Sequence, residues 1–214
     1  MNPTALMLKV HPTPLLIVIS APSGGGKTTL CHRLLAASAN MTRAITCTTR
    51  APRPGEKDGV DYYFLDPTAF LQRVEAGSFL EHATVYGKSY GTLKAEVVEK
   101  LREGRDVLLN VDVQGAAAIR SQAEQLPELK RALVTVFITP DSLHVLEERL
   151  RKRGQDSDGS IQQRMSVARQ EIAQWENFDY LIISTTIEED LRRMQAILAA
   201  ERMRTNHAKP PLSE

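Results

Sequence analysis

The amino-acid sequence predicts a three-layer α/β fold, in which helices cover both faces of a sheet with a parallel core. Apolar runs of strand length lie at residues 15–20, 106–112, 133–138 and 180–184, and helix-like segments separate them. The first run is almost entirely branched and apolar, which is typical of a strand buried on both faces of a parallel sheet. A glycine-rich loop follows this run directly, and no internal repeat or interdomain linker interrupts the pattern.

Length and composition are consistent with one domain that carries small insertions. The 214 residues are 42% hydrophobic and 25% charged, which allows a substantial core and a polar surface. The net charge of +1 predicts no bulk attraction to nucleic acid or to a membrane, and no apolar run is long enough to span a bilayer. Cys31 and Cys47 provide no disulfide framework, so we expect buried thiols and a cytoplasmic location. Residues 1–14 lack the apolar centre of a signal peptide, and residues 1–14 and 204–214 are expected to be flexible.

The segment after the first strand has the composition of a phosphate-binding P-loop. Three consecutive glycines allow the backbone to turn its N–H groups toward an anion, and the following helix adds the positive end of its dipole. Lys27 can then reach the β- and γ-phosphates of a nucleotide, and the Thr28 hydroxyl can bind Mg²⁺. Ala21 stands where the strict pattern has a glycine; an ordinary glycine-rich turn is the less favoured alternative. The predicted phosphate-binding residues are Ala21, Pro22, Ser23, Gly24, Gly25, Gly26, Lys27, Thr28 and Thr29.

A loop with two arginines follows a short β-prone stretch at residues 44–49. Two prolines and a glycine stiffen residues 50–55, so the guanidinium groups of Arg50 and Arg53 project from a rigid turn. Two such groups are suited to bind a phosphate dianion through paired hydrogen bonds. A solvated basic turn explains these residues equally well when they are considered alone.

Residues 46–92 differ in composition from the segments on both sides, and we predict that they form a small lobe inserted into the α/β core. This stretch is rich in aromatic, hydroxyl and glycine residues and contains a predicted helix at residues 66–77. The carboxylate of Glu81 lies among hydroxyl groups and is suited to accept hydrogen bonds from the N1–H and 2-amino groups of guanine. Considered alone, a glutamate is more often a surface charge.

The core resumes with a helix at residues 94–103 and a strand at residues 106–112 that closes on Asp112. An acid at the carboxyl end of a parallel strand lies at the edge of the sheet where ligands bind. A helix is predicted from Val113, and the strand at residues 133–138 follows. Thr139 and Pro140 resemble an N-cap and a first helical residue, so the next helix is expected to begin there and to run through Leu150.

A basic run at residues 149–153 and a polar segment at residues 155–159 predict a short lid at about residues 151–164. Ser160 and Gln163 form a capping box for a long helix that places Arg164 and Arg169 off its apolar stripe. The stripe is expected to consist of Ile161, Met165, Ala168, Ile172 and Trp175. Arginines on both sides of a short polar segment are suited to bring positive charge over phosphates, although a solvated helix end has the same pattern. A strand at residues 180–184 and a helix at residues 191–203 complete the fold.

Taken together, these motifs resemble the guanylate kinase family over residues 15–203, almost the whole chain. The most specific pieces are residues 20–28, 48–56, 61–64, 79–81, 90–92 and 111–115, with Arg149 and Arg153. The resemblance implies a P-loop NTPase fold with a small GMP-binding lobe and a lid. It also implies transfer of the γ-phosphate of ATP to GMP with Mg²⁺, giving ADP and GDP in purine nucleotide metabolism. Use of dGMP and the choice between monomer and homo-oligomer stay open at this stage.

The resemblance also implies roles for residues at matching positions. The expected GMP-binding residues are Thr46, Arg50, Arg53, Tyr62, Glu81, Tyr90, Thr92 and Asp112, with the arginines and tyrosines on the phosphate and the others on the guanine side. The residues expected to serve ATP, Mg²⁺ and phosphoryl transfer are Lys27, Thr28, Arg50, Arg149, Arg153 and Arg164. In-line transfer to a phosphate needs no general base, so His32, His82 and His144 are predicted to be structural or exposed.

Two positions depart from the family pattern. Asn110 stands where the family usually has an acid, which leaves open whether this position contributes to the Mg²⁺ shell. Residues 184–186 read Ser-Thr-Thr in place of the usual Asn-Asp-Asp near the adenine pocket, so ATP affinity or nucleotide preference could differ.

Two other functions are compatible with parts of the sequence. The first is a kinase of the same fold that acts on a phosphate ester without a base, such as a ribose bisphosphate; Thr46, Glu81 and Asp112 argue against it, because such a substrate has no use for them. The second is a protein-binding module of the same family that has lost catalysis. The intact Lys27 and Thr28 argue against this module.

Overall fold

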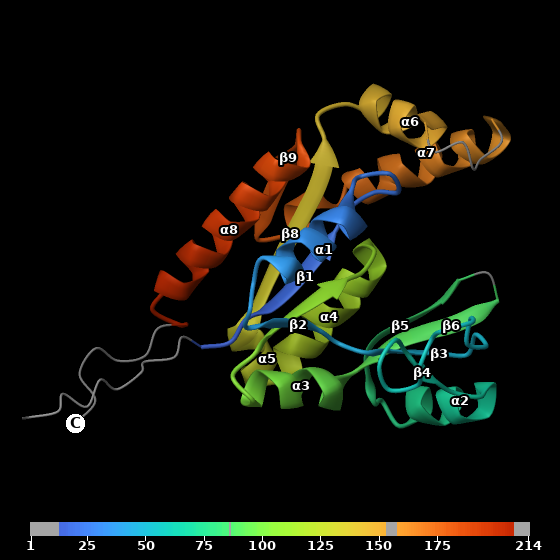
Figure 1. The fold of residues 1–214 in the computed structure, drawn as a ribbon, viewed down its shortest axis with the longest axis vertical. Coiled ribbons are helices and arrows are strands. Elements are labelled where there is room, and N and C mark those ends of the chain that lie inside the picture. The colour runs from blue at the N-terminus through green and yellow to red at the C-terminus, as the bar shows by residue number, and fades with distance from the viewer. Residues whose placement is uncertain (1–12, 86, 153–157, 208–214) are drawn as a thin grey trace, which may run out of the picture.

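The computed structural model describes residues 13–85, 87–152 and 158–207 and has a five-stranded parallel sheet at its centre (Figure 1). The strand order is β2-β7-β1-β8-β9. The strands are β1 (Leu16–Ser20), β2 (Met41–Arg43), β7 (Asp106–Asn110), β8 (Leu133–Pro140) and β9 (Tyr180–Ser184). The four strands predicted from apolar runs are confirmed. Strand β2 is additional: its three residues form no apolar run, and it pairs only with β7 at one edge of the sheet.

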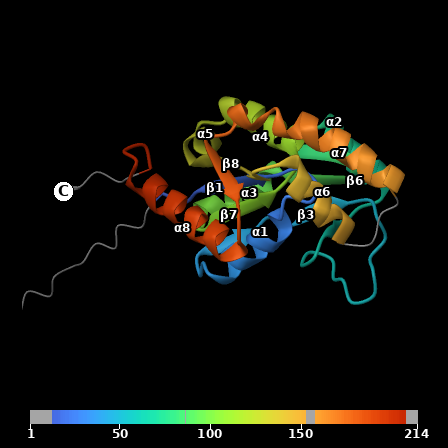
Figure 2. The same cartoon turned by 90° about the horizontal axis from the view of Figure 1, so that it is seen from above.

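Helices cover both faces of this sheet, which confirms the three-layer α/β fold (Figure 2). Consecutive residues of β1 point to opposite faces. Ile17 packs in the cluster formed with α1 (Lys27–Ala36) and α8 (Ile187–Met203). Leu16 packs in the cluster formed with α3 (Lys94–Arg102), α4 (Val113–Gln125) and α5 (Pro127–Ala132). All five residues of β1 are buried, so its carboxyl end is a fixed point from which the P-loop starts.

A second, four-stranded sheet lies to one side of the core, with strand order β4-β3-β6-β5 (Figure 1). Its elements are β3 (Thr46–Thr48), β4 (Tyr63–Phe64), α2 (Pro67–Glu75), β5 (Phe79–Val85) and β6 (Lys88–Leu93). The ring of Phe70 on α2 stacks on Phe79 of β5 with a centroid distance of 4.6 Å. Helix α2 begins where predicted, because Asp66 accepts a hydrogen bond from the backbone N–H of Ala69 at 2.9 Å.

Helices α6 (Leu143–Lys152) and α7 (Asp158–Ile172) pack against each other near the carboxyl ends of the core strands (Figure 1). The predicted start of α6 at Pro140 is wrong: Thr139 and Pro140 extend β8, and the Ser142 hydroxyl accepts the N–H of Val145 at 3.3 Å. Pro140 can end a strand because β8 still pairs there with Ser184. Helix α6 therefore starts at Leu143, with two residues between it and the end of β8.

The apolar stripe of α7 is shorter than predicted. Ile161, Met165 and Ala168 are buried against α6, and Ile172 packs beside them. Trp175 does not continue the stripe, because α7 ends at Ile172 and the tryptophan lies in a short 3-10 helix with 42% of its surface exposed. The capping box is also wrong, since α7 begins at residue 158 and Ser160 lies inside its first turn.

The described chain continues past α8 to His207, whose side chain is buried. One ring nitrogen of His207 lies 2.8 Å from the carbonyl oxygen of Glu201, and the other lies 2.6 Å from that of Arg131. The expectation of a flexible end from residue 204 therefore fails for residues 204–207. Across the three described segments, no helix combines the length and the apolar character that crossing a bilayer requires.

Candidate functional site

Three cavities lie along the edge of the core sheet where the parallel strands end. The P-loop cavity is lined by residues 21–29 together with Asp112 and Glu171. The α8 cavity is lined by Arg149, Lys152, Ser184, Thr185, Ile187 and Asp190, and it shares Gly24, Gly26 and Thr29 with the P-loop cavity. The Glu81 cavity lies between the two sheets and is lined by Thr46, Tyr62, Glu81, Tyr90, Thr92 and residues 108–111, among others. This edge is where open α/β sheets bind ligands.

The P-loop cavity is a concave surface of backbone N–H groups. Gly24 and Gly26 adopt φ angles of 90° and 89°, a left-handed conformation that favours glycine. Gly26 is also the N-cap residue of α1, and no side chain caps this helix end. The first-turn N–H groups of α1 therefore have no side-chain acceptor, and together with the helix dipole they form a site for an anion.

Lys27 connects the P-loop cavity to the Glu81 cavity. Its ammonium group donates a hydrogen bond of 2.7 Å to the carbonyl oxygen of Val111, which lines the Glu81 cavity at the end of β7. Burial lowers the pKa of the Lys27 ammonium group, and the nearby carboxylate of Asp112 acts in the opposite direction. A partly desolvated cation on this boundary can interact strongly with phosphate on either side.

Glu171 on α7 lines the P-loop cavity, and the sequence analysis did not identify it. It accepts a hydrogen bond from the backbone N–H of Ser23, while its Oε2 is buried without a partner among the described residues. Burial raises the pKa of this carboxyl group, and Lys27 acts against that rise. Glu171 follows Ala168 by three residues and therefore lies next to the apolar stripe of α7. This spacing is the only feature of the sequence that suggests an inward-facing side chain.

The Glu81 cavity contains a row of three side chains on neighbouring strands. Thr46 of β3 pairs with Thr92 of β6, and Thr92 pairs in turn with Glu81 of β5. The Thr92 hydroxyl donates a hydrogen bond of 2.7 Å to Glu81 Oε1. Burial raises the pKa of the Glu81 carboxyl group, and the hydrogen bond from Thr92 limits that rise. The row presents carboxylate and hydroxyl oxygens, which suit a ligand with adjacent N–H donors.

Arg50 lies near this row, and a carboxylate and two aromatic rings are among the groups that hold its side chain. It forms an ion pair of 2.9 Å with Glu56, and its guanidinium group lies 5.3 Å from the ring centroid of Tyr62 and 5.9 Å from that of Phe64. Its bond to Glu56 lowers the pKa of that carboxyl group. The backbone N–H of Arg53 also donates to Glu56, at 2.7 Å, so one carboxylate fixes the loop that carries both arginines. The side chain of Arg53 is exposed.

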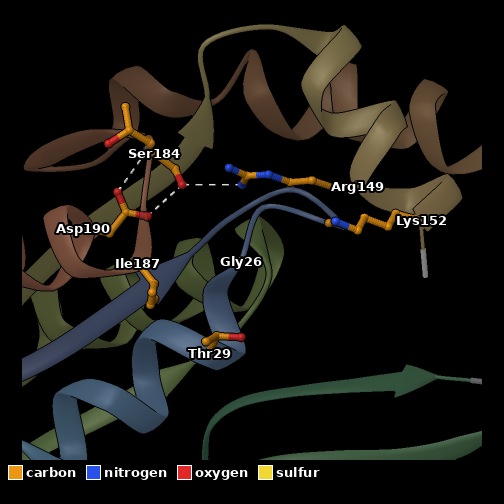
Figure 3. A pocket seen from close by; sticks show the side chains of 9 residues that line it. Gly26, Thr29, Arg149, Lys152, Ser184, Ile187 and Asp190 are labelled. Atoms are coloured by element: carbon orange, nitrogen blue, oxygen red, sulfur yellow. Dashed lines mark hydrogen bonds between the residues drawn. The ribbon is translucent and has the colours of Figure 1, made fainter.

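The α8 cavity contains an arginine from α6 and two polar side chains near the end of β9 (Figure 3). Arg149 Nη1 donates to Ser184 Oγ at 3.4 Å, and the Ser184 hydroxyl donates to Asp190 Oδ2 at 2.7 Å. Asp190 is only 5% exposed. Lys152, one turn below Arg149 on α6, lines the same cavity. Sequence reasoning missed Asp190, which belongs to no recognisable motif, and it included Lys152 only as a member of the basic run at residues 149–153.

The structure brings most of the predicted residues into these cavities. Thr46, Tyr62, Glu81, Tyr90 and Thr92 line one cavity, as residues 21–29 line another. Asp112 lies in the P-loop cavity rather than beside the row, and its Oδ1 accepts the N–H of Gly115 as the N-cap of α4. Arg164 lies on α7, two turns before Glu171 and on the same side of the helix. Arg153 is outside the described residues. His32, His82 and His144 are exposed, as predicted.

Comparisons with known proteins agree on one family. Residues 13–201 match the family model for guanylate kinase. The guanylate kinase of Coxiella burnetii is 44% identical over 198 residues, covering 92% of this chain and 93% of that protein. The guanylate kinase of Alcanivorax borkumensis is 46% identical over 190 residues, covering 89% and 88% of the two chains. A crystal structure of guanylate kinase from Anaplasma phagocytophilum matches with a TM-score of 0.68 and 34% identity, covering 92% of this chain and 90% of that one.

Proposed function

The chain belongs to the guanylate kinase family of nucleoside monophosphate kinases, and we propose that it transfers the γ-phosphate of ATP to GMP through the three cavities described above. The products are ADP and GDP. The observation that carries the proposal is the Thr46–Thr92–Glu81 row, which faces the strand end where Lys27 contacts Val111. A purine with adjacent N–H donors in the Glu81 cavity would thus have its phosphate directed toward the P-loop.

GMP occupies the Glu81 cavity in this proposal. Ionised Glu81 accepts hydrogen bonds from the guanine N1–H and 2-amino groups, while Thr92 holds the carboxylate in place. Thr46 completes the guanine side, and Asp112 acts on this side only through its charge, since it lines the P-loop cavity. The GMP phosphate lies toward Arg50 and Arg53, with the hydroxyl groups of Tyr62 and Tyr90 beside them.

ATP occupies the P-loop and α8 cavities. The backbone N–H groups of residues 24–29 bind the β-phosphate, and Lys27 bridges the donor and acceptor phosphates, because its ammonium group lies at the boundary between their cavities. Arg149 stabilises charge on the transferring phosphoryl group from α6. Arg164 approaches from the side of α7 that carries Glu171, and we assign Arg153 to the same task. We propose that residues 151–164 act as the lid and residues 46–92 as the acceptor lobe.

Mg²⁺ fits the oxygen donors at the P-loop cavity. Thr28 is the second residue of α1, and its exposed side chain lines this cavity together with the carboxylates of Asp112 and Glu171. Within the described residues, no group of three His, Cys, Asp or Glu side chains could hold a metal by itself. Mg²⁺ usually binds to few protein ligands and completes its coordination shell with phosphate oxygens and water. When bound with ATP, the ion neutralises charge on the phosphate oxygens.

The geometry explains how little covalent chemistry the protein must supply. The GMP phosphate is itself the nucleophile, so the side chains need only align the two phosphates and compensate their charge. The departure at Asn110 does not remove this capacity, because Asp112 and Glu171 supply carboxylates at the P-loop cavity. We also propose a cytoplasmic location, which the two buried free thiols of Cys31 and Cys47 support.

A coupled assay for ADP release tests the proposed function. Wild-type protein with ATP and Mg²⁺ is assayed with GMP, dGMP, AMP, CMP, UMP and ribose bisphosphate as acceptors. We expect turnover with GMP, and with dGMP if the cavity tolerates loss of the 2′-hydroxyl group. Turnover with ribose bisphosphate alone would identify a sugar-phosphate kinase. Absence of turnover with every acceptor, in a folded protein that still binds GMP, would identify a binding module and overturn the proposal.

A further inference from the structure

The guanidinium group of Arg149 lies between the P-loop and the end of β9 (Figure 3). A Cβ atom built on Gly26 would lie 4.0 Å from Arg149 Nη1, which places the group above the last glycine of the P-loop. The same nitrogen donates to Ser184 Oγ at 3.4 Å. The backbone of Arg149 belongs to α6, whereas its side chain is held by a residue at the carboxyl end of the core sheet.

The hydrogen bonds at Ser184 run in one direction. A serine hydroxyl has one proton to donate, and Ser184 gives this proton to Asp190 Oδ2 at 2.7 Å. The oxygen is left with lone pairs only, so it can act toward Arg149 solely as an acceptor. The contact between the guanidinium group and the hydroxyl is thus polarised by the carboxylate behind it.

Asp190 provides a rigid end to this chain of hydrogen bonds. The residue is 5% exposed, and its second oxygen accepts the backbone N–H of Thr185 at 3.3 Å. It lies in the first turn of α8, where the helix dipole favours a negative charge. Met194 and Leu198 bury the same helix against the core sheet, so the carboxylate cannot follow Arg149 if that side chain moves.

We propose that Asp190 and Ser184 are positioning residues for Arg149: they orient its guanidinium group over the P-loop, where the transferring phosphoryl group lies. The inference rests on the function proposed above and on the role given there to Arg149. This proposal gives a role to Ser184, which departs from the family pattern, and to Asp190, a buried carboxylate that belongs to no motif. Loss of one hydrogen bond to a charged group corresponds to roughly a tenfold effect on an equilibrium or a rate.

The first test follows the Arg149 side chain itself by NMR and needs no enzymatic activity. The Nε–H and Nη–H signals of Arg149 are assigned by their loss in Arg149→Lys. We expect rotation of the guanidinium group and exchange with water to accelerate severalfold in Ser184→Ala and Asp190→Asn. Glu188→Gln is the matched control, because it removes an exposed negative charge from the same turn of α8. Unchanged Arg149 signals in Ser184→Ala overturn the proposal, whether or not the protein phosphorylates GMP.

The second test is a double-mutant cycle in kcat, with the Kd of ATP measured separately by calorimetry. Ser184→Ala should lower kcat about tenfold in the wild-type background and less than about twofold in the Arg149→Ala background, with the Kd of ATP little changed. Equal losses in both backgrounds would show that Ser184 acts without Arg149 and overturn the proposal. If Ser184→Ala binds ATP more weakly while the Arg149 signals are unchanged, Ser184 contacts the adenine of ATP instead, and the proposal is overturned as well. Failure of wild-type protein to use GMP bears on the proposed function alone.

Discussion

The hydroxyl group of Thr92 donates its proton to Glu81 Oε1 over 2.7 Å, and both side chains stand in one row with Thr46. The hydrogen bond occupies part of one carboxylate oxygen and leaves the other oxygen to a ligand. From Glu81 to Val85, β5 pairs regularly with β6, and the register shifts only between Phe79 and Glu81, so the backbone pairing of Glu81 with Thr92 positions the row. A partly buried carboxylate held in this way is a selective acceptor for paired N–H donors, since an unpaired polar group there is costly.

Glu81→Gln should weaken GMP binding far more than catalysis. The amide presents N–H groups where guanine also presents donors, so at least one charge-assisted hydrogen bond is lost and a repulsive contact is added. We expect the KM for GMP to rise about 100-fold, while kcat changes by only a few-fold and the KM for ATP stays constant. Steady-state kinetics with each substrate varied in turn provide the measurement. Glu75→Gln, an exposed position on α2 of the same lobe, is the control.

The same substitution should stabilise the unliganded protein at neutral pH. Burial raises the pKa of Glu81, so the folded protein binds this proton more tightly than the unfolded chain does. The charged form is therefore destabilising above the folded pKa, and that penalty disappears once the pH falls below the unfolded pKa. Near pH 7, Glu81→Gln should have the higher Tm, by about 2–4 °C for each kcal/mol gained in the free energy of unfolding. The Tm values of the two proteins should converge as the pH is lowered. A gap that widens toward low pH would contradict the assigned cause.

Arg149→Ala should reduce kcat with little change in either KM. The guanidinium group lies above the P-loop and acts on charge that develops during transfer, so its loss affects the transition state more than the bound substrates. By comparison with arginines that serve phosphoryl transfer elsewhere, we expect a loss of about 10³-fold, which corresponds to roughly 4 kcal/mol. Single-turnover measurements separate this effect from product release. The control is Arg102→Ala on α3, which removes an exposed ion pair with Glu128 of α5 and should retain full activity. A near-normal kcat in Arg149→Ala would exclude the role given to Arg149.

Glu171→Gln should change how strongly Mg²⁺ promotes ATP binding. The carboxylate lines the cavity that receives the triphosphate, so it repels ATP without the metal and favours the metal complex. We expect the variant to bind metal-free ATP several-fold more tightly than wild type and to gain less from added Mg²⁺. Because burial raises the pKa of Glu171, wild type should approach the variant as pH falls, starting above the pH at which an ordinary glutamate titrates. Calorimetry with EDTA or with Mg²⁺, at two pH values, gives the ratio of the ATP affinities with and without the metal. The same ratio in wild type and in Glu171→Gln would contradict the role given to this carboxylate.

The core fold could be predicted from the sequence because its signals are local. Residues 15–19 form one uninterrupted apolar run, and the residue types of the glycines and Lys27 that follow are enough to predict a P-loop. Glu81 was identified from the hydroxyl groups around it in the sequence, and Thr46 and Thr92 through the family resemblance. Their alignment in one row depends on the pairing of three strands. No local pattern determines such a register, so only the structure reveals it.

The predictions that failed concern element ends and side chains brought in from distant segments. A Thr-Pro pair suits a helix start, but at Thr139 the pairing of β8 with β9 outweighs that preference. Trp175 fits the helical period, yet α7 stops before it. The role of Glu171 depends on its contact with Ser23, which is far away in the sequence. The role of Asp190 depends on its contact with Ser184, which belongs to no motif. A charged residue without a motif is indistinguishable in sequence from a surface charge.

Gly91→Ala should destabilise the second sheet and impair GMP binding together. A Cβ atom at Gly91 would lie 2.9 Å from Cδ1 of the Phe79 ring, closer than such atoms approach in folded proteins, and 3.0 Å from Cβ of His82, which is also a tight contact. Phe79 also stacks on Phe70, so it cannot yield without disturbing the packing of α2. We expect a loss of about 1–3 kcal/mol in the free energy of unfolding and a raised KM for GMP, because Gly91 precedes Thr92 on β6.

Gly159→Ala is the matched control for this change. Gly159 lies in the first turn of α7 with nothing within 4 Å of the added Cβ, so alanine should be neutral or stabilise the protein by up to about 1 kcal/mol. Thermal unfolding of both variants, with and without GMP, provides the comparison. If Gly91→Ala matched wild type in Tm and in the KM for GMP, the close packing of β5 on β6 would not be what holds Glu81 and Thr92 in register.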